Sequence, residues 1–356
     1  MNRRLLRQYA DNVRTWFGDV FHLFVQLRWY LIPVVVIIVV VVLLWNSDAV
    51  GKLRSNKPAP VAKNVVAAVV LRRALDGVAV TKVEAQNPAY VAVMIDNMVD
   101  AWPQAGIDKA SLVIEAPVEA SITRLMAVFP VTTAVAKVGP IRSARPYFLD
   151  WAEEYDALYT HVGGSPAALD RIGLGAVRDV NQFFQDRYFW RDDGRSAPHN
   201  VYSSSQLLAN ASAASVAKTK SRSLAPWLYA DPKQIGSVTT VTIPYASPYT
   251  VTWKYDSSNN NYVRWLNGKK FLTALGQDIR AKNVIVQYTT IVILDEVGRR
   301  RVDTIGSGAS VVYSSGQMIS GTWKKSSVKE RTRFFDDKGA EVVMAPGTSW
   351  IEVVGK

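Results

Sequence analysis

An uncharged stretch of seventeen residues, WYLIPVVVIIVVVVLLW, runs from Trp29 to Trp45 and restricts the chain more than any other feature. A helix needs about 20 mainly apolar residues to cross a bilayer, and flanking residues extend this run toward that length. Aromatic residues stand at both ends, as they do at membrane interfaces. Because five arginines precede the run, we expect a transmembrane helix over 29–45 with a cytoplasmic N-terminus and an extracytoplasmic bulk.

A cleaved signal peptide is the alternative interpretation of this segment. The basic region before the apolar run would be unusually long for a signal peptide, and Ser47, Asp48 and Ala49 form a poor cleavage site. We therefore expect an uncleaved signal-anchor that holds the protein in the cell membrane by a single pass.

The residues before the apolar run have a helical pattern of their own. Leu6, Val13 and Phe17 fall on one face, and arginines occupy the other. We expect residues 1–28 to form an amphipathic helix on the cytoplasmic leaflet, where arginines meet anionic lipid. A helix that packs on a partner protein is the alternative. Residues 46–74 are rich in Ser, Asn, Lys, Pro and Ala, which predicts a flexible tether.

The net charge of +12 would suit a nucleic-acid-binding protein, but its distribution does not. Residues 1–75 hold 11 basic and 3 acidic residues, whereas 76–356 hold 31 basic and 27 acidic ones. The excess surrounds the membrane segment, where it sets topology and lipid contact, so we expect no nucleic-acid partner. The absence of cysteine excludes disulfides, thiolate metal sites and a lipidated N-terminal cysteine.

Beyond the tether, the pattern predicts an α+β protein with two domains. Over 75–232, buried strand patterns alternate with helix starts, which indicates a mixed α/β domain. Over 233–356, short strands follow one another between turns such as Asn267-Gly268, which indicates a β-rich domain. The strands expected in the first domain are 91–96, 111–119, 124–130 and 157–162, and its helices begin at Pro146 and Pro166.

Several motifs carry a family resemblance. They are LDGV (75–78), VAVMIDN (91–97), GPIRSARPYF (139–148), EYDALYTHVGGSP (154–166) and HNVY (199–202), followed by KNVIVQ, GSGASVVY, GTWKK and PGTSWIEV in the last third. From about Leu75 to its end, the chain resembles the YerB-like family of bacterial envelope lipoproteins. The resemblance implies a membrane-tethered extracytoplasmic protein with two domains and implies no established reaction. Family members often carry a lipobox cysteine; this chain has none, and we expect the transmembrane helix to take its place.

Arg142 and Arg145 are the first candidates for a binding site. They stand three residues apart in the turn before the Pro146 helix. Arginine forms forked hydrogen bonds with carboxylates and phosphates, and a helix N-terminus also attracts anions. The two residues could therefore form an anion pocket. The alternative is that they pair with the acids Asp96, Glu115 or Glu119 and only fix loops.

His161 ends an expected strand and precedes Gly163, Gly164 and Ser165, at the place where ligands collect in open α/β sheets. A histidine there could act as an acid or base, or simply bond to the backbone. Ser165 suits a helix cap better than a nucleophile, because GGSP is not a nucleophile elbow. His199 could join His161 if the fold brings the two together.

The acids Asp96, Glu115 and Glu119 complete the set of candidate ligand-binding residues. Glu115 and Glu119 could form a carboxylate pair for glycan cleavage, although Pro117 between them leaves their geometry open. Salt bridges to Arg124 and Arg142 are the alternative role. A metal site needs about three protein ligands, and the spacing does not supply them, so we expect no metal and no cofactor.

These features lead to three hypotheses about function. The first is a binding module whose α/β domain holds an anionic or glycan-like envelope ligand, such as a cell-wall glycan, through Arg142, Arg145 and His161. The second is an envelope hydrolase that uses His161 and His199 with a carboxylate. The third is an accessory scaffold that regulates another envelope enzyme as its protein partner. No complete catalytic signature is present, so no catalytic residue is assigned.

Overall fold

The computed structural model describes residues 3–46, 70–216, 222–232 and 235–356. The chain divides into two compact units, Met1–Ala68 and Val69–Lys356. Most of the tether expected over 46–74 lies outside the described residues.

The first unit contains one long helix, α1 (Arg3–Asn46), where the sequence predicted two. Its two parts, Asn12–Tyr30 and Ile32–Leu43, meet at an angle of 43°. The bend lies just before Pro33, which cannot donate a backbone hydrogen bond to the preceding turn and whose ring crowds that turn. Among the described residues, no single helix has the length and apolar character for a membrane span, and only the two parts of α1 taken together reach them.

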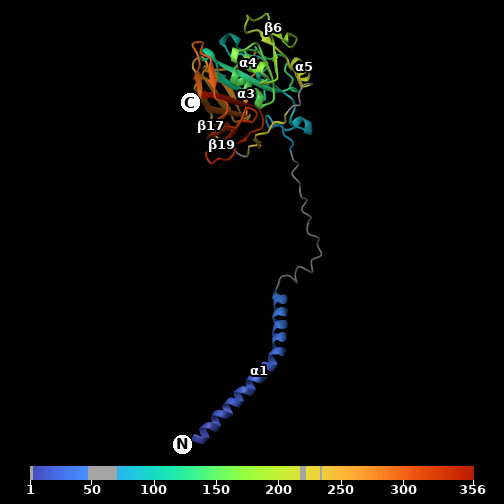
Figure 1. Ribbon diagram of the computed structural model, residues 1–356, viewed down its shortest axis with the longest axis vertical. Coiled ribbons are helices and arrows are strands. Elements are labelled where there is room, and N and C mark those ends of the chain that lie inside the picture. Colours follow the sequence, from blue (N-terminus) through green and yellow to red (C-terminus); the bar gives the residue numbers. More distant parts are fainter. Residues whose placement is uncertain (1–2, 47–69, 217–221, 233–234) are drawn as a thin grey trace. The chain divides into compact units, whose positions relative to one another are not determined.

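The second unit is built around a mixed ten-stranded sheet (Figure 1). One half of the sheet is formed by β1 (Tyr90–Ile95), β2 (Leu112–Pro117), β3 (Thr123–Pro130), β4 (Leu158–His161) and β5 (Asp179–Asn181). The other half is formed by β14 (Asn283–Thr289), β17 (Gly306–Ser314), β18 (Gln317–Lys325), β19 (Arg333–Asp336) and β21 (Ser349–Gly355). The order across the sheet is β19-β18-β17-β14-β21-β2-β3-β1-β4-β5.

The last strand joins the two halves. β21 lies between β14 and β2 and runs parallel to both. Its Ile351 is in register with Ile114, and its Glu352 with Glu115. The regions 75–232 and 233–356 therefore contribute to one continuous sheet. Strands buried on both faces are typically rich in apolar residues, which agrees with the sequences of β2 and β21.

One face of this sheet is covered by α3 (Pro146–Glu154). Proline suits the first turn of a helix because its missing N–H has no partner there. Phe148 and Trp151 of α3 pack with Met94 and Ile114 of the sheet. The second predicted helix is also present as α4 (Pro166–Gly173). The mixed α/β character of the first region and the β-rich character of the second are thus confirmed.

The opposite face is covered in part by a second sheet. It contains β9 (Thr240–Ile243), β10 (Val251–Asp256), β11 (Asn261–Leu266), β12 (Lys269–Lys270) and β13 (Arg280–Ala281). Its Trp253 and Tyr262 share a core with Val113 and Trp350 of the large sheet. Trp253 and Trp350 make an edge-to-face contact, with 5.1 Å between ring centroids.

Short strand pairs and helical turns fill the periphery. The pairs are β6 (Trp190–Arg191) with β7 (Val201–Tyr202), β8 (Leu228–Tyr229) with β20 (Val343–Met344), and β15 (Ile291–Ile293) with β16 (Arg300–Val302). The 3₁₀ turns are η1 (Val83–Gln86), η2 (Val99–Ala101), η3 (Ile107–Lys109), η4 (Glu119–Ser121) and η5 (Asp186–Tyr188). The turn η4 begins two residues after β2 ends, so the strand predicted to reach residue 119 stops at Pro117.

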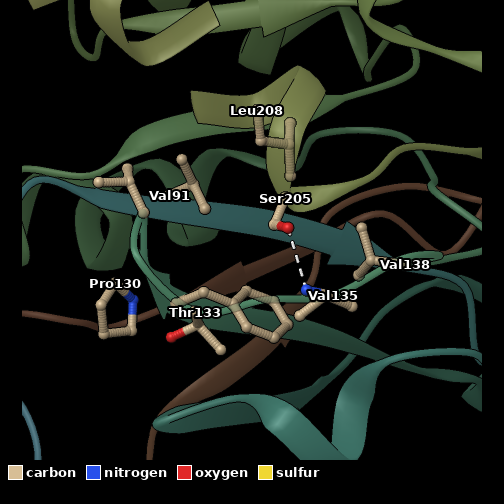
Figure 2. Close-up of a pocket in the computed structure, with 9 residues that line it drawn as sticks. Val91, Pro130, Thr133, Val135, Val138, Ser205 and Leu208 are labelled. Carbon is tan, nitrogen blue, oxygen red and sulfur yellow. Dashed lines mark hydrogen bonds between the residues drawn. The ribbon is translucent and has the colours of Figure 1, made fainter. Parts of the chain in front are cut away.

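The helix α5 (Ser205–Val216) covers a small apolar hollow. Figure 2 shows Val91, Val138 and Leu208 around it, with Ser205 accepting a hydrogen bond from the backbone N–H of Val135 at 3.0 Å. The hollow has a volume of about 10 Å³, which is barely enough for one water molecule. It is a packing feature rather than a ligand site.

Candidate anion-binding site

Two turns from different parts of the sequence lie side by side on one edge of the second unit. The first turn spans residues 139–145 and the second spans 161–166. The backbone N–H of Ala144 donates to the carbonyl of Gly163 at 3.0 Å, and the N–H of Ser165 donates to the carbonyl of Ala144 at 3.2 Å. These bonds hold the arginine motif against the Gly-Gly-Ser turn, which brings two of the sequence motifs into one place.

Arg142 in the first turn forms an ion pair with Asp96, just after β1. Its Nε lies 3.0 Å from Oδ2 of Asp96. The same oxygen lies 2.7 Å from Nδ1 of His199, and the other carboxylate oxygen accepts the backbone N–H of Met98 at 3.1 Å. Within the part of the chain that the structure describes, the two Nη groups of Arg142 donate to no protein acceptor. Half of the guanidinium is therefore fixed and half is available.

Arg145 forms a forked ion pair with Glu119. Its Nε and Nη2 donate to the two carboxylate oxygens at 2.5 and 2.7 Å, and its Nη1 donates to the carbonyl of Ala144 at 2.8 Å. Burial by itself would raise the pKa of Glu119, but the hydrogen bonds and charge of Arg145 outweigh it and lower that pKa. Arg145 thus shapes the site more than it offers free donors.

Arg124 of β3 is the most buried cation of the site, with 6% of its surface exposed. Its Nη1 donates to the carbonyl of Ser143 at 3.0 Å, and its Nε has no protein acceptor. Burial and the nearby charge of Arg145 lower the pKa of Arg124 to about 10, which still leaves it charged at neutral pH. A buried guanidinium with an unused donor is costly unless an anion completes it.

These side chains border an open groove with a volume of about 570 Å³. Its lining contains Met98, Val118, Glu119, Ile122, Arg124, Arg142, Ser143, Arg145, Gly164, Ser165, Pro166, Val297 and Arg299. Ser165 precedes the first turn of α4, and its Oγ is buried without a hydrogen-bond partner. The groove therefore combines four arginines with a helix N-terminus and a free hydroxyl, which is the chemistry of an anion site.

The acids around the groove do not cancel its arginines. Arg142 pairs with Asp96 and Arg145 with Glu119, and Arg299 pairs with Asp295 at 2.7 Å. Four arginines against three carboxylates leave a net charge of +1. Among the described residues, Arg124 is the groove arginine without an ion-pair partner, and it is the most buried of the four.

His161 does not line the groove. Its side chain is wholly buried, with Nδ1 2.7 Å from the carbonyl of Gly163 and Nε2 3.1 Å from Oδ2 of Asp179. Both ring nitrogens are therefore occupied by protein oxygens, and the buried ring holds the turn of residues 161–166 in place. His199 is bound to Asp96 instead, so the two histidines have no carboxylate in common.

The two glycines of the second turn have different surroundings. Gly163 has a φ of +56°, a conformation that residues with a Cβ rarely adopt, and the ring of Phe183 lies over it. Gly164 borders the groove directly and packs against Leu169.

Glu115 lies away from the groove, in a sealed cluster between the two sheets. Its Oε2 is 2.8 Å from Nη2 of Arg264, and its Oε1 accepts a hydrogen bond from Thr123 at 2.6 Å. Nη1 of Arg264 also lies 3.2 Å from Glu352, which accepts the indole N–H of Trp253 at 2.7 Å. The carboxylate neighbour of Glu115 is therefore Glu352, in register on β21, and not Glu119.

Burial and the negative charge of Glu115 raise the pKa of Glu352 to about 8. The two acids thus share one arginine, and burial beside Glu115 favours the protonated form of Glu352. The predicted salt bridges of Glu115 and Glu119 to Arg124 and Arg142 are not formed, because Glu115 binds Arg264 and Glu119 binds Arg145.

The described residues contain no group of three or more His, Asp or Glu side chains that could hold a metal ion. Sequence reasoning missed Arg264 and Arg299, and it named Arg124 only as a salt-bridge partner of Glu115 and Glu119. A signal existed for Arg124 and Arg264, because each interrupts an otherwise apolar strand and a buried arginine needs a partner. Arg299 stands in a polar loop and gave none.

The fold and the groove define an α+β protein with a mixed central sheet and an arginine-lined surface site. The model for the N-terminal domain of a protein family of unknown function, DUF3048, matches residues 75–221, and that for its C-terminal domain matches 241–351. Over 282 residues, the chain is 32% identical to the YerB protein of Bacillus subtilis (strain 168). The aligned residues make up 77% of this chain and 82% of the relative. The chain therefore belongs to the DUF3048 family, and its resemblance to YerB-like proteins is confirmed.

The crystal structure of YerB from Bacillus subtilis has the same fold. It superposes with a TM-score of 0.71 at 30% sequence identity, covering 80% of this chain and 96% of the YerB chain. The family description assigns no activity, so function must be argued from the groove.

Proposed function

We propose that the protein is a membrane-anchored, extracytoplasmic envelope protein that binds an anionic ligand in the arginine groove. The name of its relative YerB marks that protein as a proposed lipoprotein, which supports an envelope location. The apolar run of α1 would supply the anchor in a single pass, since the chain has no cysteine to carry a lipid. The arginines before that run favour a cytoplasmic N-terminus.

The observation that carries this proposal is the set of unused donors in the groove. The Nε of Arg124 and the hydroxyl of Ser165 are buried without a hydrogen-bond partner among the described residues. The Nη groups of the partly exposed Arg142 donate to no acceptor there, and all three side chains line the same hollow. Leaving such groups unpaired is unfavourable, and a bound anion would satisfy several of them at once. Charge-assisted hydrogen bonds of this kind are about twice as strong as neutral ones.

The acids paired with the groove arginines hold these arginines in place before a ligand binds. Asp96 and Glu119 hold Arg142 and Arg145 in fixed orientations, so a ligand finds them already ordered. Preorganised donors bind more tightly because less side-chain entropy is lost on binding. The hydrolase hypothesis gains no support from this geometry, because His161 and His199 contact different carboxylates.

The test is anion binding by the full-length protein in a non-ionic detergent, with inorganic phosphate and pyrophosphate as probes in calorimetry. Arg142→Gln should weaken pyrophosphate binding roughly tenfold or more, since it removes a charge-assisted fork. The matched control is Arg301→Gln, which removes an exposed arginine paired with Asp303 outside the groove lining and should bind as the wild type does.

A second groove variant keeps the result interpretable. Arg299→Gln removes a half-exposed groove arginine without touching the Asp96 network, so its effect cannot arise from that network. Melting temperatures of Arg299→Gln and Arg301→Gln should stay close to that of the wild type, whereas Arg142→Gln should lower it, because the buried Asp96 loses its arginine. Unchanged pyrophosphate affinity in both Arg142→Gln and Arg299→Gln, with folding intact, would overturn the proposal.

A further inference from the structure

An exposed aromatic ring lies beside the arginine groove. The ring of Phe183 sits over Gly163, where a Cβ atom would come within 2.7 Å of its Cε2. Nevertheless, 64% of the Phe183 surface is exposed. Gly164, which follows Gly163 in the chain, lines the groove itself. The exposed ring of Phe183 therefore packs on the same turn that lines the groove.

Hydrogen bonds to the backbone hold the loop that carries Phe183 against the turn at Gly163. The side-chain oxygen of Asn181, at the end of β5, accepts the N–H of Gly163 at 3.1 Å and the N–H of Phe183 at 3.2 Å. One buried amide thus ties the loop that carries Phe183 to the turn that carries the groove. Glycine is required at 163 because a larger residue would collide with the ring and strain the turn.

The core does not account for this ring. In the same segment, Tyr188 and Phe189 are buried in the core shared by the two sheets, which is the usual fate of aromatics there. Phe183 and Phe184 point outward instead, with Leu169 partly exposed beside Gly164. Phe183, Phe184 and Leu169 thus expose apolar surface around the turn that lines the groove, and such a patch rimmed by polar residues is a feature of binding surfaces.

We infer that the anionic ligand is an acidic polysaccharide, with one sugar ring stacked on Phe183 and its carboxylates held by the groove arginines. This inference rests on the proposed function and adds the substrate class. A pyranose ring presents a face of C–H groups, which complement the negative π face of phenylalanine, while its acid group suits a forked arginine. An open groove of about 570 Å³, with an exposed aromatic ring on the turn that lines it, fits a chain of such units better than a small isolated anion.

The test compares ligands that differ by one property in the full-length protein in detergent. Tetragalacturonate carries both sugar rings and carboxylates, maltotetraose carries rings without charge, and inorganic phosphate carries charge without a ring. Wild-type protein should bind tetragalacturonate more tightly than phosphate and should not bind maltotetraose. Phe183→Ala should weaken tetragalacturonate binding roughly three- to tenfold and leave phosphate binding unchanged.

Matched variants separate stacking from a general effect on the surface. Phe184→Ala removes the adjacent exposed ring, which does not lie over Gly163, and should bind tetragalacturonate as the wild type does. Phe183→Trp should retain binding because it keeps a flat apolar face. Arg142→Gln should lose affinity for both tetragalacturonate and phosphate.

The outcomes distinguish the two proposals. Wild-type affinity for tetragalacturonate in Phe183→Ala would overturn the polysaccharide assignment while leaving the anion groove in place. Tight binding of maltotetraose would overturn it as well, since the arginines would then contribute nothing. Failure of the wild type to bind any of the anionic probes would instead overturn the proposed function itself.

Discussion

Arginine–carboxylate pairs occur in two places in the molecule, partly exposed in the groove and fully buried between the sheets. In the groove, Arg142 and Arg145 are paired with acids but remain partly exposed. Between the sheets, Arg264 is paired with Glu115 and Glu352, and all three side chains are fully buried. The pairs have similar lengths, so distance does not separate them. What separates them is whether the cation faces solvent, where a ligand can reach it.

The sealed cluster has a structural role that the groove lacks. Glu115 belongs to β2, Glu352 to β21 and Arg264 to β11, so one guanidinium connects the two halves of the large sheet to the second sheet. Its charge also lies 4.6 Å from the ring centroid of Trp350. A buried pair is weak evidence of net stabilisation, but removing one partner leaves an uncompensated charge.

The largest expected effect is that of Arg264→Met. The substitution keeps the volume but leaves Glu115 and Glu352 buried without a cation, so it should lower the free energy of unfolding by about 3–5 kcal/mol. Urea denaturation followed by tryptophan fluorescence measures this. The control is Arg333→Gln, at a partly exposed pair with Glu341, where about 1 kcal/mol or less is expected.

A triple variant sharpens this result. Adding Glu115→Gln and Glu352→Gln to Arg264→Met removes the stranded charge of Glu115 and the titratable group beside it, and should recover part of the lost stability. A loss below 1 kcal/mol in the single variant would mean that the cluster is not a key contact between the sheets.

The next effect is a dependence of stability on pH. Below the ordinary carboxyl pKa of 4.5, Glu352 is protonated in both the folded and the unfolded chain. Between that value and its folded pKa of about 8, only the folded chain keeps the proton, so the folded state binds more protons and its stability falls as the pH rises. Above about 8 this contribution is lost.

Glu352→Gln should flatten the fall in stability between pH 5 and 8, because glutamine cannot titrate and can still accept the indole N–H of Trp253. Thermal unfolding across this range measures the slope. The control is Glu341→Gln, at the partly exposed pair with Arg333, which should leave the slope unchanged. An identical slope in Glu352→Gln and the wild type would contradict the assignment of the proton to Glu352.

The smallest expected effect lies in the groove. Glu119→Gln removes the carboxylate that occupies Arg145, which should free its donors and add a positive charge to the groove. We expect pyrophosphate to bind severalfold more tightly, with a steeper dependence on salt, at a cost in stability of about 1 kcal/mol or less. Weaker binding in this variant would show that Glu119 positions Arg145 for the ligand rather than competing with it.

The comparison also shows what the sequence could reveal about the site. The turn containing Arg142 and Arg145 and the turn containing Gly164 and Ser165 were predicted from charge, glycine and helix-start signals, and the structure brings them together. The orientation of the His161 ring was not predictable. The local sequence pattern of a histidine at a strand end is the same whether its ring faces a groove or is buried against a carboxylate. The ring faces Asp179, on the neighbouring strand β5.

The sequence offered Asp96, Glu115 and Glu119 as acids that Arg142 and Arg145 could pair with, and the structure pairs Arg142 with Asp96 and Arg145 with Glu119. It could not decide which acid meets which arginine. Glu115 and Glu119 stand four residues apart, yet Pro117 ends the strand between them and sends them to different partners. The partner of Glu115 comes from a strand about 150 residues later, and only the packing of two sheets decides that contact.

The sequence by itself determined the elements of this protein, because local rules set them. Proline and serine mark the starts of α3 and α4, apolar runs mark the central strands, and the uncharged run before residue 46 marks the apolar half of α1. Tertiary structure alone decided that β21 lies between β14 and β2, so that the two regions form one sheet. It also decided which arginines face solvent, since exposure depends on contacts between residues far apart in the chain, and that exposure separates a binding groove from a sealed ion cluster.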